Sequence, residues 1–515
     1  MTQTRAAILV AAAGLAGVAT ALVLAPEYFA SRGVPFDDAW VHAVYARSLA
    51  RSGTLAFNPG VPSTGATSTL WTLIAAVPHA VTSRVPTALL GVKLLGLALH
   101  LLTAFVLLRA FTWRGRVGFP ALAGCMLAAF HPDLVSASMS GTETPLATLA
   151  AAGLLLAVGG AVWYGFLAFA VPFVRPELTI LCLAMPVALL LRRDHRRLGV
   201  LSVAACLGTA VGYGVIVIHA LAFSERPLPA TWYAEAGAGH LSPLDFEVIG
   251  FSEILGRIPV VDSSILLMIA GLVAVYVASN GQTSPIPLAR AAAALLGALL
   301  FCAASFVLVP PIDPATFDHQ RHVLSVLPLM VAAIPILVCG ALGRLLPARG
   351  GRLVQIAMVG VLVLSVVVVS RFRYLTLSND ARNVDDVQGG IARQLASLNP
   401  DQVVWAVDAG AVRYFGRAFV VDLLAGHTAQ MIGADAQRFL DERRPAYIEM
   451  VPLWSSLDAA SSRRLPVTRF EPPPLDRTSN DPPMPERWLV KCDDPAVSGQ
   501  IAVKGRVFEF RCAER

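Results

Sequence analysis

The sequence predicts a polytopic α-helical membrane protein that carries a C-terminal extracytoplasmic α/β domain. Of its 515 residues, 56% are hydrophobic and only 14% are charged, whereas a typical soluble domain has about 25% charged residues. Apolar runs of spanning length recur along residues 1–370. After residue 370 the chain becomes rich in Arg, Asp and Pro. The composition excludes a disordered protein, a coiled coil and a fully soluble enzyme.

We expect about eleven membrane-spanning helices. The run from Ala6 to Ala25 has the features of a signal peptide, but the many later runs favour an uncleaved first helix. The pair 146–160 and 161–174 either forms two spans or, because Gly159 and Gly160 interrupt it, one broken or re-entrant segment. The other expected spans lie near 87–109, 118–139, 178–192, 198–222, 263–279, 291–309, 323–342 and 353–370.

Arg-rich loops support this number of spans independently. If the N-terminus is cytoplasmic, the Arg-bearing loops at 109–116, 192–197, 290 and 343–352 are all cytoplasmic, as the positive-inside rule requires. An odd number of spans then places the C-terminal domain, 371–515, outside a cell (inner) membrane. The loops 26–86, 140–145, 223–262 and 310–322 would also face outward. The apolar segment 69–83 would break this pattern as a span, so we expect an interfacial helix there.

The C-terminal region has the pattern of a small α/β domain of about 130 residues. Short apolar strands at 403–407 and 418–422 alternate with helix-like segments such as Ala434–Arg443, and AYIEMV follows as a further strand. Residues 471–486 form a Pro-rich loop. Outside the cytoplasm Cys492 and Cys512 would form a disulfide that closes a 20-residue loop; otherwise they are free thiols.

The first outer loop contains two adjacent carboxylates, Asp37 and Asp38, at the start of an expected helix. Apolar residues follow at helical spacing, with Arg47 and Arg51 off that face, which predicts an amphipathic helix on the membrane surface. One aspartate is expected to cap the helix. The second would stay ionised and could act as a general base on a hydroxyl group. The apolar stripe is Val41, Val44, Tyr45 and Leu49.

This loop resembles the first outer loop of GT-C glycosyltransferases, most closely that of the bacterial branch with mycobacterial-type arabinofuranosyltransferases. Trp40 replaces the usual Tyr, and Ser63-Thr64 stands where Val-Glu is common, which bears on substrate identity. Seventeen residues match the pattern in order: Asp37, Asp38, Ala39, Tyr45, Ala46, Leu49, Gly53, Phe57, Asn58, Pro59, Gly60, Pro62, Gly65, Thr67, Ser68, Leu70 and Trp71.

Shorter segments downstream are similar to further motifs of these enzymes. The run Ser140 to Thr144 resembles S-G-M-E-T, and Arg175-Pro176-Glu177 resembles R-P-E/D. The run His319 to His322 stands where the family has an R-Y or R-H pair. The segments around Asp408 and Asp422 resemble the D-x-G and D-L-x-G of the C-terminal domain.

Each downstream motif also has a plainer interpretation. Glu143 is either a site residue or a solvated loop acid, and Arg175 either pairs structurally with Glu177 or serves the site, as charges at membrane depth often do. Arg321 suits a phosphate, while His319 and His322 either assist it or anchor a span. Lys93 either snorkels outward or binds the donor. Asp408 and Asp422 are expected in turns or caps, and His100 as a packed residue.

The resemblance implies an enzyme that moves a sugar from a polyprenyl-phosphate donor to an extracytoplasmic glycan, lipid or protein, with inversion. In this hypothesis Asp37 is the general base and Asp38 orients it, while Arg321, with Arg175 and His322, neutralises the departing phosphate. Arabinofuranose, another pentose and a hexose all remain open as the sugar.

No dedicated metal site is visible, although the acid pair with Glu143 could hold a divalent cation weakly. No feature indicates nucleic acid as a partner. The alternatives to an enzyme are a lipid or solute transporter or flippase with an outer glycan-binding domain, and a non-catalytic scaffold. A transporter would be favoured by inverted repeats or acids at the membrane midplane, and the sequence shows neither.

Overall fold

The computed structural model describes residues 1–26, 34–191, 194–224, 226–231, 286–308 and 318–345. It describes scattered positions in 346–385, and then all of 386–513 except 388, 425, 432–435, 453–454, 472–485 and 504–505. Some residues are described in backbone only: 187–191, 224, 286, 305–308, 318–322, 341–345, 392 and 429. The expected span 263–279 and nearly all of the Pro-rich loop 471–486 therefore lie outside the described residues.

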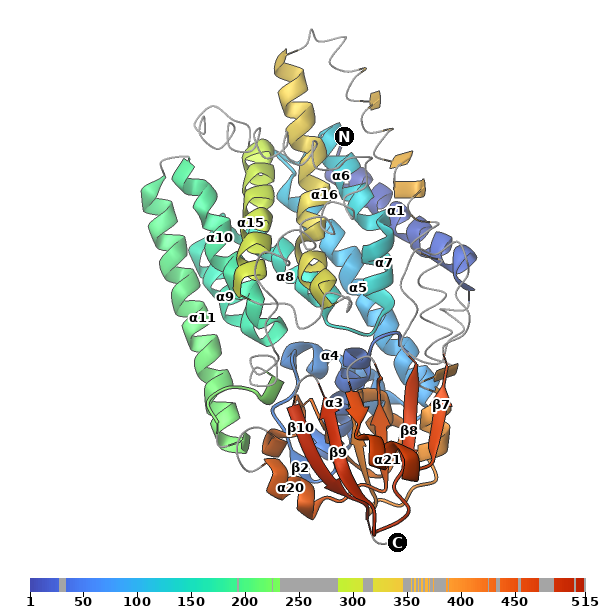
Figure 1. The fold of residues 1–515 in the computed structure, drawn as a ribbon. Helices are drawn as coiled ribbons and strands as arrows, with labels where there is room; N and C mark the ends of the chain where they lie inside the picture. The colour runs from blue at the N-terminus through green and yellow to red at the C-terminus, as the bar shows by residue number, and fades with distance from the viewer. Residues whose placement is uncertain are drawn as a thin grey trace.

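The described part of residues 1–345 is a helical bundle (Figure 1). Its helices fall where the apolar runs predict them. In chain order they are α1 (Gln3–Leu24), α5 (Val85–Ala110), α6 (Phe119–Phe130), α7 (Pro132–Met139), α8 (Thr144–Ala157), α9 (Ala161–Val174), the 3₁₀ turn η1 (Pro176–Leu178), α10 (Thr179–Leu191), α11 (His195–Ser224), α15 (Ile286–Leu308) and α16 (Asp318–Leu345).

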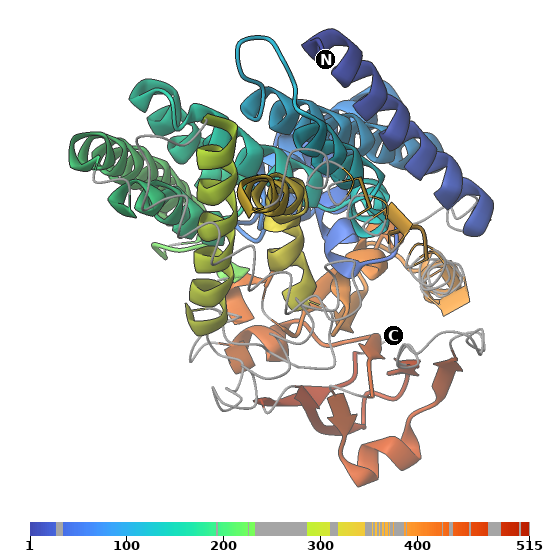
Figure 2. The ribbon, with the colours of Figure 1, turned by 90° about the horizontal axis from the view of Figure 1, so that it is seen from above.

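Five of the described helices are long and apolar enough to cross a membrane, or six if the bent pair α6–α7 is one span. α8 and α9 are shorter, and they are separated at Gly159 and Gly160, where the sequence predicts a break. Residues 323–340 of α16 are 94% buried, so this helix forms the interior of the bundle. α1 and α11 flank it on opposite sides (Figure 2).

The described Arg-bearing segments at Arg109, Arg197 and Arg290 gather at one end of the bundle. Arg290 donates a hydrogen bond to the carbonyl of Ala110 at 2.6 Å, and Arg197 donates to the carbonyl of Val158 at 2.8 Å. The N-terminal Met1 lies beside the same end, because its carbonyl accepts a hydrogen bond from Val117. The C-terminal domain lies at the opposite end (Figure 1). This separation agrees with the sidedness that the charge pattern predicts.

The first outer loop lies between the bundle and the C-terminal domain (Figure 1). It consists of α3 (Asp37–Ser52), the short antiparallel pair β1 (Ala56–Asn58) and β2 (Val61–Pro62), and α4 (Thr69–Val81). Ser68 caps α4 by accepting a hydrogen bond from the backbone of Trp71. Leu73, Val77 and Val81 form an exposed apolar stripe along α4, as expected of the interfacial helix predicted at 69–83.

The C-terminal domain contains two sheets. The larger has the order β4-β3-β5-β8-β7, in which β3 is parallel to β4 and β5, while β8 is antiparallel to β5 and β7. The smaller is antiparallel, with the order β10-β9-β6. The strands are β3 (Val403–Ala406), β4 (Phe419–Asp422), β5 (Tyr447–Met450), β6 (Ser455–Leu457), β7 (Val467–Phe470), β8 (Arg487–Lys491), β9 (Ser498–Val503) and β10 (Arg506–Arg511). The helices are α18 (Gly389–Leu395), α19 (Ala409–Phe415), the 3₁₀ turn η3 (Ala429–Met431), α20 (Ala436–Glu442) and α21 (Ala459–Arg464).

The central strand β3 is buried on both faces. Val404 and Ala406 face a core that the domain shares with α3. Val403 and Trp405 face the core between the two sheets. Because successive strand residues point to opposite faces, this double burial explains why the run VVWAV is continuously apolar.

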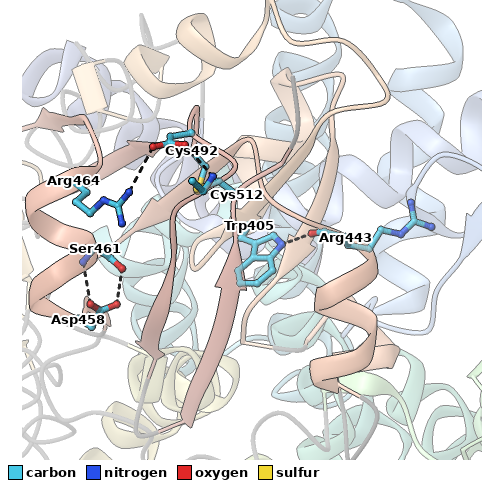
Figure 3. Close-up of a disulfide and its surroundings, with 9 residues drawn as sticks. Trp405, Arg443, Asp458, Ser461, Arg464, Cys492 and Cys512 are labelled. Carbon is cyan, nitrogen blue, oxygen red and sulfur yellow. Dashed lines mark hydrogen bonds and ion pairs between the residues drawn. A yellow bond between two sulfur atoms is a disulfide. The ribbon is translucent and has the colours of Figure 1, made fainter.

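The structure joins Cys492 to Cys512, which follow β8 and β10 respectively. Both cysteines belong to the core between the sheets, so the disulfide ties the larger sheet to the smaller one (Figure 3). On the far side of the same core Trp405 donates its indole N–H to the carbonyl of Arg443 at 2.7 Å (Figure 3).

Candidate functional site

Asp37 is bound by the C-terminal domain. Its two carboxylate oxygens accept hydrogen bonds from the backbone N–H groups of Gly410 and Ala411, at 3.1 and 3.2 Å. These are the first turn of α19, whose unpaired N–H groups and dipole favour an anion. The sequence predicts an aspartate that caps its own helix. The cap residue of α3 is instead Phe36, and Asp37 binds the N-terminus of a neighbouring helix.

The other end of α19 binds α3 as well. Arg47 donates to the carbonyl of Tyr414 at 2.6 Å, and its guanidinium lies 4.3 Å from the centre of the Tyr414 ring. Trp40 packs against Tyr414 and Phe415, with ring centroids 5.1 and 4.9 Å away. A carboxyl group that accepts N–H groups at the N-terminus of α19 and a cation at its C-terminus both match the helix dipole. The two helices are therefore held in a defined register.

These contacts correct the prediction that α3 lies on a membrane surface with a solvated polar face. Residues 39–46 are buried on every side. The face that we expected to be solvated is covered by α19, and α4 packs on the other side. The polar residues of α3 thus bind protein groups, which a pattern of apolar positions cannot reveal.

The motif around Asn58 docks the domain further. The Asn58 side chain accepts from the backbone N–H of Val420 and donates to its carbonyl, at 2.9 and 2.8 Å. It thereby completes the outer edge of strand β4. Arg413 donates to the carbonyl of Phe57 at 3.0 Å. The F-N-P segment of the resemblance therefore has a structural explanation, since it joins the loop to the domain.

Asp37 belongs to a cluster of three carboxyl groups and one guanidinium, whose other members are Asp408, Glu449 and Arg487. Arg487 forms ion pairs with Asp408 and, at 3.5 Å, with Glu449. Glu449 also accepts from the backbone N–H groups of Val407 and Asp408, both at 2.9 Å. Asp408 lies close enough to Asp37 for its negative charge to act on the Asp37 carboxyl.

Burial, and then the charge of Asp408, raises the pKa of Asp37 well above its ordinary value. Burial likewise raises the pKa of Glu449 from 4.5 to about 7, although Arg487 opposes the shift. Asp37 is therefore not the freely ionised carboxylate that its place at a helix start predicts.

This cluster predicts that the folded protein loses stability as the pH rises. Because Glu449 has a higher pKa when folded, its contribution is fully present below pH 4.5 and is lost as the pH passes about 7. We expect the Tm to fall by a few °C between pH 5 and pH 7.5, since about 1 kcal/mol shifts Tm by roughly 2–4 °C in domains of this size. Glu449→Gln should flatten this slope, whereas the exposed Glu442→Gln should leave it unchanged. An equal slope in Glu449→Gln would contradict the prediction.

The opposite face of α3 carries Asp38 and His42. They are one turn apart, so they project from the same side of the helix. His42 Nε2 lies 2.9 Å from Glu143 Oε2, and Glu143 Oε1 lies 3.4 Å from Arg175. Arg175 also pairs with Glu177 at 2.5 Å. Thus α3, the turn before α8 and the end of α9 are joined by one line of charged groups.

The turn that carries Glu143 depends on the motif S-G-T-E-T. Gly141 has a φ of +83°, and a Cβ on it would lie 2.9 Å from the side chain of Val34, so glycine is required on both counts. Its carbonyl accepts the indole N–H of Trp71 at 2.9 Å. Glu143 is 3% exposed, so it is not the solvated loop acid of the plainer interpretation.

The C-terminal domain also contributes His427. Its ring stacks on Phe57 at 4.8 Å and lies within electrostatic range of Asp38 and His42. Burial lowers its pKa, so the imidazole is neutral near pH 7. Asp422 holds this loop by accepting the backbone N–H groups of Leu424 and His427, both at 2.9 Å. Asp422 is thus a turn residue, as expected.

The remaining expected site residues are Lys93 and the basic residues at 319–322. Lys93 is 5% exposed inside α5. It does not snorkel outward, because α7 and α8 pack on that helix. The side chains of Arg321, His319 and His322 lie outside the described residues. The helix that carries them, α16, begins at the end of the bundle that faces the C-terminal domain (Figure 1).

Three functional candidates were not predicted from the sequence: His42, His427 and Arg487. His42 could have been found from its spacing of four residues after Asp38. Nothing in the sequence marks the other two, because they approach the first loop only through the fold. Within the described residues no group of three His, Cys, Asp or Glu side chains has the arrangement of a metal site. Glu143, the third acid of the proposed weak cation site, is instead engaged with His42 and Arg175.

Comparison with known proteins identifies the fold. The chain is similar to ArnT from Cupriavidus metallidurans bound to undecaprenyl phosphate, with a TM-score of 0.54 and 15% identity over 92% of this chain and 97% of that one. ArnT in the apo state gives a TM-score of 0.48 at 16% identity, over 92% and 97% of the two chains. An Archaeoglobus fulgidus oligosaccharyltransferase tethered with an acceptor peptide gives 0.47 at 10% identity, over 84% and 69%.

The last two scores are too low to support an inference. Comparisons with protein families and with curated proteins find no match. The first match extends over almost the whole of both chains. The chain therefore has a polytopic membrane fold like that of ArnT, with a C-terminal domain built on sheets.

Proposed function

We propose that the protein is an inverting glycosyltransferase that moves a sugar from a polyprenyl-phosphate donor to an acceptor outside the membrane. The strongest support is that the two faces of α3 make different contacts. One face is fixed to the C-terminal domain through Asp37, Trp40 and Arg47. On the other face His42 contacts Glu143 of the bundle, and Asp38 lies one turn before His42. The similar ArnT structure holds undecaprenyl phosphate, which is the kind of lipid that such a donor would release.

In the proposed reaction Asp38 is the general base. It takes the proton of the acceptor hydroxyl as that oxygen attacks the anomeric carbon. The bond from this carbon to the phosphate oxygen breaks, and polyprenyl phosphate leaves with both electrons of the bond. This reverses the roles that the sequence suggests for the two aspartates, because α19 already engages both oxygens of Asp37.

The cations would stabilise the leaving phosphate. Arg175 lies at the end of α9, held by Glu143 and Glu177. We keep Arg321 and His322 as further phosphate ligands, because α16 carries them at the same end of the bundle (Figure 1). A guanidinium can contact two phosphate oxygens at once. Its effect grows as negative charge develops on the phosphate.

The sugar follows from the first-loop resemblance alone. Arabinofuranose is the first candidate, and another pentose or a hexose the next. The acceptor would be a glycan, a lipid or a protein of the cell envelope. The natural location of such an enzyme is the inner membrane, with the C-terminal domain outside.

Turnover of a donor panel tests the proposal. The purified protein, reconstituted in lipid vesicles, is incubated with polyprenyl-phosphate pentoses and hexoses, and release of polyprenyl phosphate is measured with and without candidate acceptors. We expect release from one donor, faster with acceptor. Movement of the intact donor across the vesicle membrane without cleavage would refute the transferase and support a flippase.

A further inference from the structure

Three buried polar atoms lie in segments that contact one another where the first outer loop touches the C-terminal domain. They are the hydroxyl oxygens of Thr64 and Thr231 and the Nδ1 atom of His427. None of them has a hydrogen-bond partner in the part of the chain that the structure describes. Thr64 and Thr231 are 5% and 7% exposed. Buried groups of this kind are normally satisfied.

Two glycines bring these groups together. A Cβ on Gly65 would lie 2.6 Å from Nδ1 of His427 and 2.4 Å from the carbonyl oxygen of Gly426. A Cβ on Gly426 would lie 3.6 Å from the methyl group of Thr231. The segments 63–65, 426–427 and 230–231 are thus in direct contact. The backbone of Gly65 lies close enough to the His427 ring to raise its pKa. The distance and angles to Nδ1 nevertheless do not form a hydrogen bond.

The surroundings define what could satisfy these atoms. Two hydroxyl groups and a neutral imidazole can each donate or accept a hydrogen bond. Phe57 and Tyr45 pack beside the imidazole, with ring centroids at 4.8 and 6.0 Å. The carboxylate of Asp422 is occupied by backbone N–H groups of its own loop. Uncharged hydroxyl groups next to aromatic rings are typical of carbohydrate binding, since a sugar presents both hydroxyls and an apolar face.

The position of these three atoms relative to Asp38 indicates whether the sugar belongs to the donor or to the acceptor. On the domain side, the negative charge of Asp38 raises the pKa of His427. On the bundle side, His42 contacts Glu143, which in turn contacts Arg175. A lipid-linked donor phosphate must approach from the bundle side, because its chain lies in the membrane. The domain side is left for the acceptor.

We propose that Thr64, Thr231 and His427 form a subsite for the hydroxyl groups of an uncharged sugar residue of the acceptor glycan, beside the general base. This rests on the proposed function. In the present structure the three atoms are shielded from solvent, so the first loop and the 423–428 loop must separate to admit the sugar. Unsatisfied groups lower the free-energy cost of that opening, because they gain partners when it occurs. Ser63-Thr64, where related loops carry an acid, would then select a neutral acceptor.

The test uses Thr64→Val and Thr231→Val, with Thr468→Val, an exposed threonine on β7 of the C-terminal domain, as the control. Binding of neutral pentose and hexose oligosaccharides to the reconstituted protein is measured by saturation-transfer NMR. We expect Thr64→Val and Thr231→Val, the two seam variants, each to weaken binding about tenfold. The Tm of each should stay equal to or above that of the wild type. Valine removes a hydroxyl that has no partner, so stability should not suffer. A lowered Tm would show that the hydroxyls are satisfied in the free protein and would overturn the subsite, as would unchanged binding.

Donor turnover separates this proposal from the proposed function. With a cleavable donor, the seam variants should raise the KM for acceptor about tenfold and leave acceptor-independent donor hydrolysis unchanged. Loss of hydrolysis in the seam variants would contradict an acceptor subsite. If the wild type cleaves no donor but binds oligosaccharide through these threonines, the glycosyltransferase proposal fails and the carbohydrate site stands.

Discussion

Asp38→Asn is expected to lower glycosyl transfer by about 10²–10⁴-fold, the usual contribution of a general base, whereas Asp37→Asn should retain most of the activity. The reason lies in the two sides of α3. Asp37 accepts two N–H groups of α19, and burial and the charge of Asp408 raise its pKa. Asparagine is uncharged and keeps one acceptor oxygen for these N–H groups. At position 38, however, an amide cannot take the acceptor proton.

The two variants are controls for each other, because they differ in one neighbouring position and are both isosteric. Initial rates with the cleavable donor and an acceptor are compared after circular dichroism and Tm have shown that both proteins are folded. The opposite ranking, with Asp37→Asn inactive and Asp38→Asn active, would restore Asp37 as the base. Equal losses would indicate that the two carboxyls act as a unit.

Arg487→Met is expected to destabilise the C-terminal domain by about 3–5 kcal/mol, the usual cost of breaking a buried ion pair from one side. Arg487 is the one cation paired with Asp408 and Glu449 in the described part of the cluster. Its charge also opposes the rise in the pKa of Asp37. Its removal leaves three buried carboxyls without compensation. The free energy of unfolding can be measured by denaturant titration at pH 7.5.

Two further variants make this prediction specific. Adding Glu449→Gln to Arg487→Met removes one uncompensated charge and should restore part of the stability, whereas Arg469→Met should cost about 1 kcal/mol or less. Arg469 is exposed on the neighbouring strand β7 and stacks over Trp488, so it supplies a surface cation–π contact only. Stability of Arg487→Met equal to that of the wild type would refute the account of the cluster.

Much of the architecture was readable from the sequence, because apolar length and period report the environment of a segment directly. The limits of α5, α9 and α10 agree closely with the apolar runs, and strands β3, β4 and β5 lie where the short hydrophobic runs predict them. The break at Gly159 and Gly160, the helix start at Asp37 and the pairing of Arg175 with Glu177 also follow from local chemistry.

The roles of the charged side chains were decided only by the tertiary structure. The sequence places Asp37 and Asp38 at the start of a helix, but local pattern cannot tell which one meets α19, since Gly410 is more than 370 residues away. His427 lies within electrostatic range of Asp38, and Arg487 within range of Asp37, although each pair is similarly far apart in the sequence. Hydrophobic period is a property of neighbours along the chain, whereas a buried carboxyl takes its protonation and its function from the groups that folding brings to it.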